Sequence, residues 1–358
     1  MSLLYKSVLP NSQRSSYGPN ENVNFKLSFE GTKMKKGSLR LNGKLKFTDT
    51  TADAVTNFKD VQYSALTGIH SAFVGIVSSF DKMGVVENIQ DFPRFHKMKM
   101  MSLSDTSQAV AVSDNITSLK LASDLQTNSF LYGAKTYKYL PFSCDLDIMV
   151  NRTNRDIPYS KTGDINLQFR LASNAEFYTA TDTTRGRSWE LQDLELTYQC
   201  EASTPADNKQ KVSGTAYYSV KHSISSNLSS INTNVPAVCN AVSCSFVLTA
   251  NENQQDKDHL GIVRPPGISS VKFNFNDSLS MVHYEMKSDE ELLLNYFRSM
   301  GNSPYHDVNV RDYDGFGIGL KFGPVDLNKN KLGLELLTSI DNTNPHSLYM
   351  YFHSFISF

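Results

Sequence analysis

Asp145 and Asp147 could supply a pair of carboxylates for general acid and base catalysis, because a single residue separates them. Such pairs cleave glycosidic bonds when the two carboxyl groups flank the scissile bond. In an extended chain, however, alternate side chains point to the same face. Both carboxylates would then lie opposite Leu146, and we interpret them as a solvated strand face.

Glycines 315, 317 and 319 alternate with apolar residues, but Leu320 stands where a dinucleotide-binding loop needs its third glycine. Alternating glycines in a strand predict instead the close approach of another backbone or a large aromatic side chain. The preceding segment Asp312–Gly315 could begin a calcium loop, yet the distant Glu of such a loop is missing. We interpret that segment as a turn whose Asp side chains bond their own backbone.

Other motifs that carry chemistry are missing. The sequence has no GxSxG elbow, HExxH pair, Walker loop or zinc-type spacing of cysteine and histidine. We therefore predict no catalytic, cofactor-binding or metal-binding residues and no enzymatic activity.

The charge balance restricts the partners of the chain. Its 358 residues include 35 Lys and Arg and 36 Asp and Glu, which gives a net charge of -1. Proteins that hold nucleic acid by charge alone are usually strongly basic, and we expect no sequence-specific nucleic-acid binding. The run His96–Met101 would place its lysines on one strand face and its alternate methionines on the other, so we predict sheet structure there.

The N-terminal residues hold only a short, broken apolar stretch and no small-residue cleavage site. We therefore expect no secretory signal and an intracellular compartment. No segment approaches the roughly 20 apolar residues of a membrane span. The four cysteines form no Cys-x-x-Cys pair, and we expect them to be reduced and buried.

Strict alternation of apolar and polar residues predicts half-buried strands. The clearest case is 23–30, where Val23, Phe25, Leu27 and Phe29 share one face. Similar patterns predict strands at 38–47, 72–80, 144–150, 165–171, 194–200, 244–249, 271–275, 318–322, 332–336 and 348–352. Many short strands separated by turns favour sandwiches or barrels over an alternating βα fold.

Helical patterns are local. Ser288 can cap a helix, because Glu291 follows three residues later as a capping box requires. Leu292, Tyr296 and Met300 then share one helical face before Gly301. A weaker helical pattern covers 114–125, and the polar stretch 201–211 separates two all-β halves of comparable size.

Several short segments follow one another in the same order as similar segments in a known family. In the first half these are 68–73, 84–92, 139–142, 157–158, 163–171 and 189–198, and in the second half 316–322 and 348–352. Together they resemble the double jelly-roll major capsid proteins of the adenovirus and tectivirus lineage, particularly those of polinton-like viruses, adintoviruses and virophages. The resemblance covers most of the chain.

The resemblance implies an all-β fold of two tandem eight-stranded jelly-roll sandwiches (a double jelly roll) with a few short flanking helices. It implies an N-terminal arm over 1–20, a first jelly roll over 21–203, a linker over 204–211 and a second jelly roll over 212–358. Three copies would form a pseudo-hexagonal homotrimeric capsomer. Many capsomers would then assemble the icosahedral shell of a virion.

In relatives such an arm lies on the inner side of the shell and ties neighbours together. This implies assembly contacts for Tyr5, Arg14 and Tyr17. The implied partners are neighbouring capsomers, penton and minor capsid proteins and, where the virion has one, an internal membrane. The implied location is the capsid of the virion.

Two other hypotheses stay open. Some glycan amidases also pair two jelly rolls and place carboxylates near a tryptophan, and Trp189, Glu190 and Asp193 could form such a set. A carbohydrate-binding or viral attachment module would need exposed aromatic side chains on loops, whereas the aromatics here mostly fall within strand patterns. The shell protein is the leading hypothesis.

Overall fold

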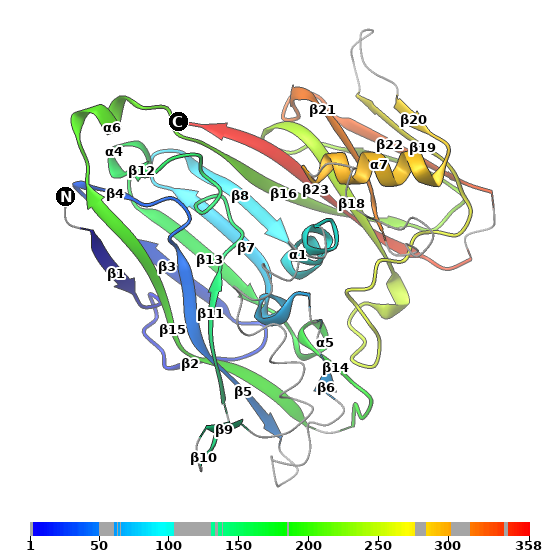
Figure 1. The fold of residues 1–358 in the computed structure, drawn as a ribbon. Coiled ribbons are helices and arrows are strands. Elements are labelled where there is room, and N and C mark those ends of the chain that lie inside the picture. Colours follow the sequence, from blue (N-terminus) through cyan, green and yellow to red (C-terminus); the bar gives the residue numbers. More distant parts are fainter. Residues whose placement is uncertain are drawn as a thin grey trace.

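Two β-sandwiches that share one continuous sheet make up the protein (Figure 1). The computed structural model describes residues 3–49, 61–62, 64, 66–103, 130–132, 135–137, 139–184, 186–275, 284–301, 316–339 and 343–358. Strands of the N-terminal half build one sandwich, and strands of the C-terminal half build the other. The prediction of an all-β fold with a few short helices is therefore confirmed.

The shared sheet is 8-stranded, and its neighbouring strands are antiparallel except at one joint. At that joint β16 and β8 run parallel, with Tyr218 opposite Asn88. In spatial order the strands are β21 (Ile318–Asp326), β18 (Val238–Leu248), β23 (His346–Ser357), β16 (Ser213–Ile224), β8 (Gly84–Gln90), β7 (Phe73–Phe80), β13 (Ile165–Leu171) and β3 (Asn22–Leu27). The two halves of the chain thus meet between β16 and β8.

Two further sheets complete the sandwiches. On the N-terminal half a 7-stranded sheet consists of β11 (Tyr139–Asp145), β5 (Arg40–Asp49), β15 (Arg187–Ala202), β4 (Thr32–Met34), β12 (Ile157–Pro158), β1 (Leu4–Val8) and β2 (Ser16–Tyr17). On the C-terminal half a 4-stranded sheet consists of β17 (Leu228–Thr233), β22 (Leu332–Thr338), β19 (Ile268–Phe275) and β20 (Tyr284–Met286). Buried side chains between the sheets form the core.

Small elements connect these sheets. Two short ladders pair β6 (Val61–Gln62) with β14 (Thr179–Ala180) and β9 (Phe130–Tyr132) with β10 (Lys135–Tyr137). The helices are η1 (Gly68–Ala72), α1 (Phe92–Met101), α4 (Tyr159–Thr162), α5 (Asn174–Phe177), α6 (Pro205–Lys209), η2 (Thr249–Asn251) and α7 (Asp289–Ser299). Among the described residues, none of these helices has the length and apolar content to cross a membrane.

Alternation decides which face of each strand is buried. In β3 every second residue is buried, from Val23 to Leu27, and the ring centroids of Phe25 and Phe169 lie 5.9 Å apart in an edge-to-face pair. The long β15 repeats this pattern on both sides of an irregularity between Gln192 and Glu195. Burying such apolar faces supplies most of the driving force for folding.

One predicted strand is displaced. The sequence predicts a strand over 144–150, but β11 ends at Asp145 and the chain then turns. The Asn151 side chain holds this turn, because its amide donates to the carbonyl oxygens of Leu39 and Leu146 at 2.8 and 2.9 Å. The prediction is wrong here because the apolar residues after Asp145 are all buried within a turn and so need no strand to bury them: Leu146, Ile148, Met149 and Val150.

The prediction of a strand at His96–Met101 is also wrong. These residues belong to helix α1, which starts with Pro93 in its first turn. Phe92, Phe95 and Met98, spaced by three, are fully buried. A period of three is visible only when the pattern is extended upstream of His96, and the shorter run imitates a strand.

Helix α7 confirms the prediction of a capped helix after Ser288. The Ser288 hydroxyl accepts a hydrogen bond from the Glu291 backbone N–H at 3.2 Å. The Glu291 carboxylate accepts from the Lys287 N–H at 3.0 Å, one residue before the position that a capping box would use. The helix predicted at 114–125 and the turn at Asp312–Gly315 lie outside the described residues.

The four cysteines are buried and unpaired, as predicted. Burial raises the pKa of Cys144 and of Cys239 to about 12. Because the thiolate is the reactive form, such cysteines are inert at neutral pH.

The alternating glycines admit close neighbours, as predicted. A Cβ atom on Gly317 would overlap the carbonyl oxygen of Cys244 and lie 3.1 Å from the Tyr296 ring. A Cβ on Gly319 would lie 3.0 Å from the Val242 oxygen. Gly323 in the same strand has nothing within 4 Å of that position.

Gly317→Ala should therefore destabilise the protein, because the backbone of β18 cannot move away as a flexible side chain could. Overpacking of this kind typically costs about 1–3 kcal/mol. Gly323→Ala is the matched control and should change the free energy of unfolding by less than about 0.5 kcal/mol. Urea denaturation of both variants measures the difference, and equal midpoints would contradict the close packing at Gly317.

Candidate assembly surfaces and the joint between the two halves

The carboxylates near Trp189 do not form a catalytic set with it. The Trp189 side chain is buried against Phe177, with ring centroids 4.5 Å apart. Glu190 lies on the opposite strand face, where it accepts hydrogen bonds from Lys46 at 2.9 Å and Gln192 at 2.7 Å. Asp193 accepts one from Lys44 at 2.6 Å. The arrangement gives no support to the glycan hydrolase.

The second carboxylate pair is also separated. Asp145 stays half-exposed and pairs with Arg40 at 2.7 Å. Asp147 lies beyond the end of β11 and pairs with Lys99 and Arg152, at 2.6 and 2.9 Å. The prediction of one shared solvated face is therefore wrong for Asp147. Among the described residues, no three His, Cys, Asp or Glu side chains gather as metal ligands.

The N-terminal residues lie along β15 rather than apart from the sandwich. Strand β1 pairs with β15, with Tyr5 opposite Gln199, and the Tyr5 side chain is 76% exposed. Arg14 pairs with Glu21 at 2.9 Å and lies over the Tyr17 ring, 5.1 Å from its centroid. Tyr17 itself is buried and bonds Ser12 at 2.5 Å. Tyr5 and Arg14 thus lie at the surface, whereas Tyr17 belongs to the core of its own chain.

Several large apolar side chains reach solvent. Leu228 on β17 and Leu337 on β22 are cross-strand partners and are 63% and 44% exposed. The other exposed members are Leu3, Leu4, Tyr5, Leu9, Met83, Val85, Val238 and Phe355. Leu228 and Leu337 thus form an adjacent exposed apolar pair, whereas exposed apolar side chains that stand singly are normal on protein surfaces.

The joint between the halves depends on few backbone contacts. Besides the pairing of Tyr218 with Asn88, an isolated bridge connects Thr153 with Gly214. The Ser219 hydroxyl accepts from the Gln90 N–H at 2.5 Å and the Tyr218 hydroxyl donates to the Val85 oxygen at 3.4 Å. Side chains must therefore supply most of the contact.

A group of four charged side chains, which we call the joint cluster, lies beside this joint; Glu87 is fully buried and the other three are partly exposed. It consists of Glu87 on β8, Lys99 on α1, and Asp147 and Arg152 in the turn after β11. Glu87 accepts from the N–H groups of Met149 at 2.8 Å and Tyr217 at 3.1 Å and pairs with Arg152. Arg152 also donates to the Thr215 oxygen at 2.9 Å. The cluster thus links β8 to β16 of the other half.

Burial controls the electrostatics of the joint cluster. It raises the pKa of Glu87, although Arg152 and two backbone N–H groups oppose the shift. Burial would also raise the pKa of Asp147, but Lys99 and Arg152 hold it far below its ordinary value. Nearby, burial lowers the pKa of His353 to about 3, helped by the charges of Lys99 and Arg152.

Aromatic rings surround these charges. The Arg152 guanidinium lies 4.2 Å from the centroid of the Tyr217 ring. On α1, Phe95 lies 4.4 Å from Tyr217 and 4.9 Å from Tyr351 between ring centroids. The sequence patterns do not predict the joint cluster. The signal that could have indicated it is Glu87, a charged residue on the same strand face as the apolar Ile89.

Arg152→Met should destabilise the protein by about 3–5 kcal/mol, because it leaves Glu87 buried without its cation. The double variant Glu87→Gln with Arg152→Met should regain most of that loss. Lys46→Met removes a half-exposed ion pair with Glu190 and should cost at most about 1 kcal/mol. Chemical denaturation of the single and double variants gives the double-mutant cycle. If the two single losses of unfolding free energy simply add in the double variant, Glu87 and Arg152 are not coupled.

Comparison with known proteins gives matches to solved structures alone: no protein-family model matches the chain, and no curated protein sequence matches it. The Faustovirus major capsid protein aligns with a TM-score of 0.59 at 10% identity, covering 99% of this chain and 90% of its own. VP54 of PBCV-1, fitted into a reconstruction of the virophage Sputnik, gives 0.58 at 10% identity, covering 99% and 94%.

A chain in the cryo-EM structure of the Sputnik virophage also has a TM-score of 0.59, at 11% identity, with 99% of this chain and 86% of that one covered. Identities this low establish the fold and no more. Because the matches extend over both sandwiches and the joint between them, this chain has the double jelly-roll fold.

Proposed function

We propose that this protein is a major capsid protein, of which three copies form a pseudo-hexagonal capsomer and many capsomers form an icosahedral shell. The observation that carries the proposal is the alignment of 99% of the chain with the Faustovirus major capsid protein. The whole chain, rather than one module of it, has the architecture of a shell subunit. On this proposal its location is the virion and its role is structural rather than enzymatic.

The geometry of the chain suits such a tile. Two similar sandwiches per chain present six similar units in a trimer, which is the shape that packs hexagonally. A head-to-tail contact between subunits closes into a ring when its rotation is fixed. The joint cluster supports a fixed angle between the two sandwiches, and the exposed pair Leu228 and Leu337 offers an apolar contact.

The partition of the chain belongs to the same proposal. Residues 21–203 form the first jelly roll and 212–358 the second, with 204–211 as the linker and 1–20 as the arm. Strand β15 ends at Ala202, α6 occupies Pro205–Lys209, and β16 begins at Ser213, which supports these boundaries. Tyr5 and Arg14 act as arm contacts with neighbours, while Tyr17 anchors the arm to β15.

Neighbouring capsomers are the main partners on this proposal, with penton and minor capsid proteins at positions that a trimer cannot fill. No observation in the described residues favours the glycan hydrolase or the carbohydrate-binding module. The first would need Trp189 and Glu190 on one face, and they lie on opposite faces of β15.

Light scattering on the purified chain should give about 120 kDa, because three chains of 40.1 kDa associate. Negative-stain images of the same peak should show a hexagonal outline. A species that stays at 40.1 kDa over a wide range of protein concentration would contradict the capsomer.

Deletion of residues 1–9 should weaken shell formation and leave the trimer intact, because it removes β1 with Tyr5 and keeps Tyr17 in the core. Tyr5→Ser should show a smaller loss of the same kind. Tyr17→Phe is the matched control, since it keeps the buried ring and should assemble normally. Electron microscopy of assembled shells gives the result, and unchanged assembly by the deletion variant would overturn the role of the arm.

A further inference from the structure

One end of the molecule carries six cationic side chains that form no ion pair with any described residue. This end bears α4, α6 and the C-terminus, at the upper left of Figure 1. We call the six together the cationic end. They are Lys36, Lys82, Arg155, Lys161, Lys209 and Lys211.

Hydrogen bonds show that these residues are neighbours. Lys82 donates to the Ser160 carbonyl oxygen at 2.7 Å, which connects the turn after β7 to α4. The Ser160 hydroxyl donates to Asn208 at 2.5 Å, which connects α4 to α6. Arg155 donates to Gln210 at 2.7 Å. The six cations therefore belong to one continuous surface built from segments far apart in the sequence.

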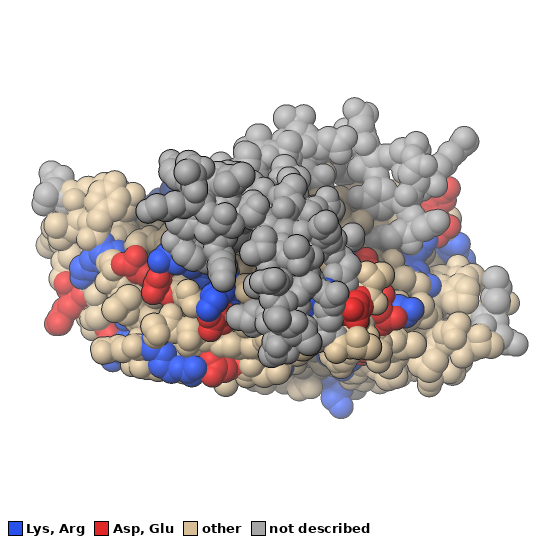
Figure 2. Space-filling view, turned by 90° about the horizontal axis from the view of Figure 1, so that it is seen from below, with Lys and Arg blue, Asp and Glu red and all other residues tan. Residues whose placement is uncertain are grey.

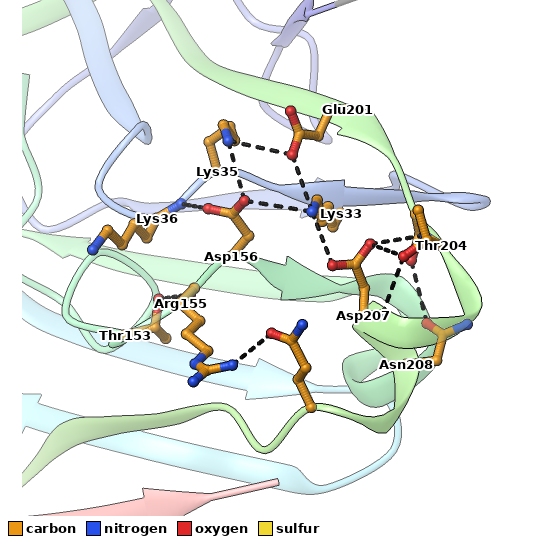
Figure 3. A network of polar contacts seen from close by, with 12 residues as sticks. Lys33, Lys35, Lys36, Thr153, Arg155, Asp156, Glu201, Thr204, Asp207 and Asn208 are labelled. Atoms are coloured by element: carbon orange, nitrogen blue, oxygen red, sulfur yellow. Dashed lines mark hydrogen bonds and ion pairs between the residues drawn. The ribbon is translucent and has the colours of Figure 1, made fainter. Parts of the chain in front are cut away.

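The carboxylates beneath this surface are mostly neutralised by two lysines. Lys33 pairs with Glu201 and Asp207, at 3.0 and 2.9 Å, and Lys35 pairs with Asp156 and Glu201, at 3.2 and 3.3 Å (Figure 3). Hydrogen bonds from Thr204 and Lys33 lower the pKa of Asp207 to about 2. These three acids outnumber Lys33 and Lys35 by one, so a single carboxylate charge is left to offset the six other cations.

Few other carboxylates oppose the cationic end. Glu30, in the turn before β4, and Asp81, beside Lys82, form no ion pair within the described chain. Asp81 accepts a hydrogen bond from Asn166 at 3.0 Å. With Lys33, Lys35 and their acids included, eight cations face five carboxylates, so this end keeps a positive excess of three, although the whole chain has a net charge of -1.

A hollow of about 300 Å³ opens at this surface, and its lining includes Lys36, Arg155, Asn154 and Gln210. In Figure 3 Lys36 and Arg155 extend away from the paired group of Lys33, Lys35 and Asp156. The face seen from below in Figure 2 differs, because both signs of charge are interspersed over its described residues.

We propose that the cationic end binds the phosphodiester backbone of nucleic acid without reading its sequence. Lysine and arginine together with amide and hydroxyl side chains make most contacts to phosphate oxygens, and Asn154, Ser160 and Gln210 accompany the cations here. The inference rests on the proposed function, since a shell encloses a genome. Met83, 39% exposed beside Lys82, is the feature that would instead suit an anionic lipid surface.

The test is binding of a labelled 20-base-pair DNA duplex of arbitrary sequence to the full-length chain, followed by fluorescence anisotropy from 50 to 200 mM KCl. Affinity should fall steeply with salt, because bound cations displace counterions from the phosphates. The variant Lys82→Gln, Lys161→Gln, Lys209→Gln should bind more weakly. Its slope of log affinity against log salt should shrink by about one for each removed cation that contacts phosphate.

The matched control replaces three exposed cations elsewhere, as Lys321→Gln, Lys331→Gln, Arg298→Gln, and should bind DNA as the native chain does. Equal weakening in both triple variants would overturn the proposal, and so would retention on phosphatidylserine vesicles without duplex binding. Light scattering of the same samples separates the two claims. Trimers that fail to bind DNA refute the cationic end alone, whereas monomers refute the capsomer.

Discussion

The buried carboxylate of Glu87 is the constraint on which the arrangement of the two sandwiches depends. It lies on β8 in one half and accepts a hydrogen bond from the backbone of Tyr217 in the other. A buried charge without partners costs several kcal/mol, so the halves must keep the geometry that brings Arg152 and two backbone N–H groups to it. Any other arrangement of the two halves would leave the Glu87 carboxylate buried without partners. This cost fixes the joint as much as the attraction between Glu87 and Arg152 does.

The joint cluster matters because backbone pairing alone would define the angle between the two sandwiches poorly. The parallel pairing of β16 with β8 has a single pair of facing residues, Tyr218 and Asn88. Packing of Phe95 between Tyr217 and Tyr351 adds apolar contact, but apolar contact tolerates small rotations better than a directional hydrogen bond does. A tile that must close a ring with its copies needs the stricter device, since an error in the angle accumulates around the ring.

Sequence patterns predict the strands with one buried face and are less consistent where both faces are covered, since β18 is predicted in part and β16 is not. Strand β3 alternates strictly and is correctly predicted, whereas β16 has three consecutive buried residues from Ala216 to Tyr218 and shows no period of two. Helix α1 was mistaken for a strand because its lysines and methionines alternate over a short run. The joint cluster could not be predicted, because its members lie far apart in the sequence and meet only through the fold.

The charge balance illustrates the same limit. A net charge of -1 excludes a chain that is uniformly attractive to polyanions, but it contains no information on how charges are distributed over the surface. At the end bearing α4 and α6, Lys33 and Lys35 pair with the acids Asp156, Glu201 and Asp207, which leaves one carboxylate charge against the six unpaired cations. Because screening confines electrostatic attraction to about 10 Å at moderate salt, a ligand at that end responds to the local excess of cations and not to the total.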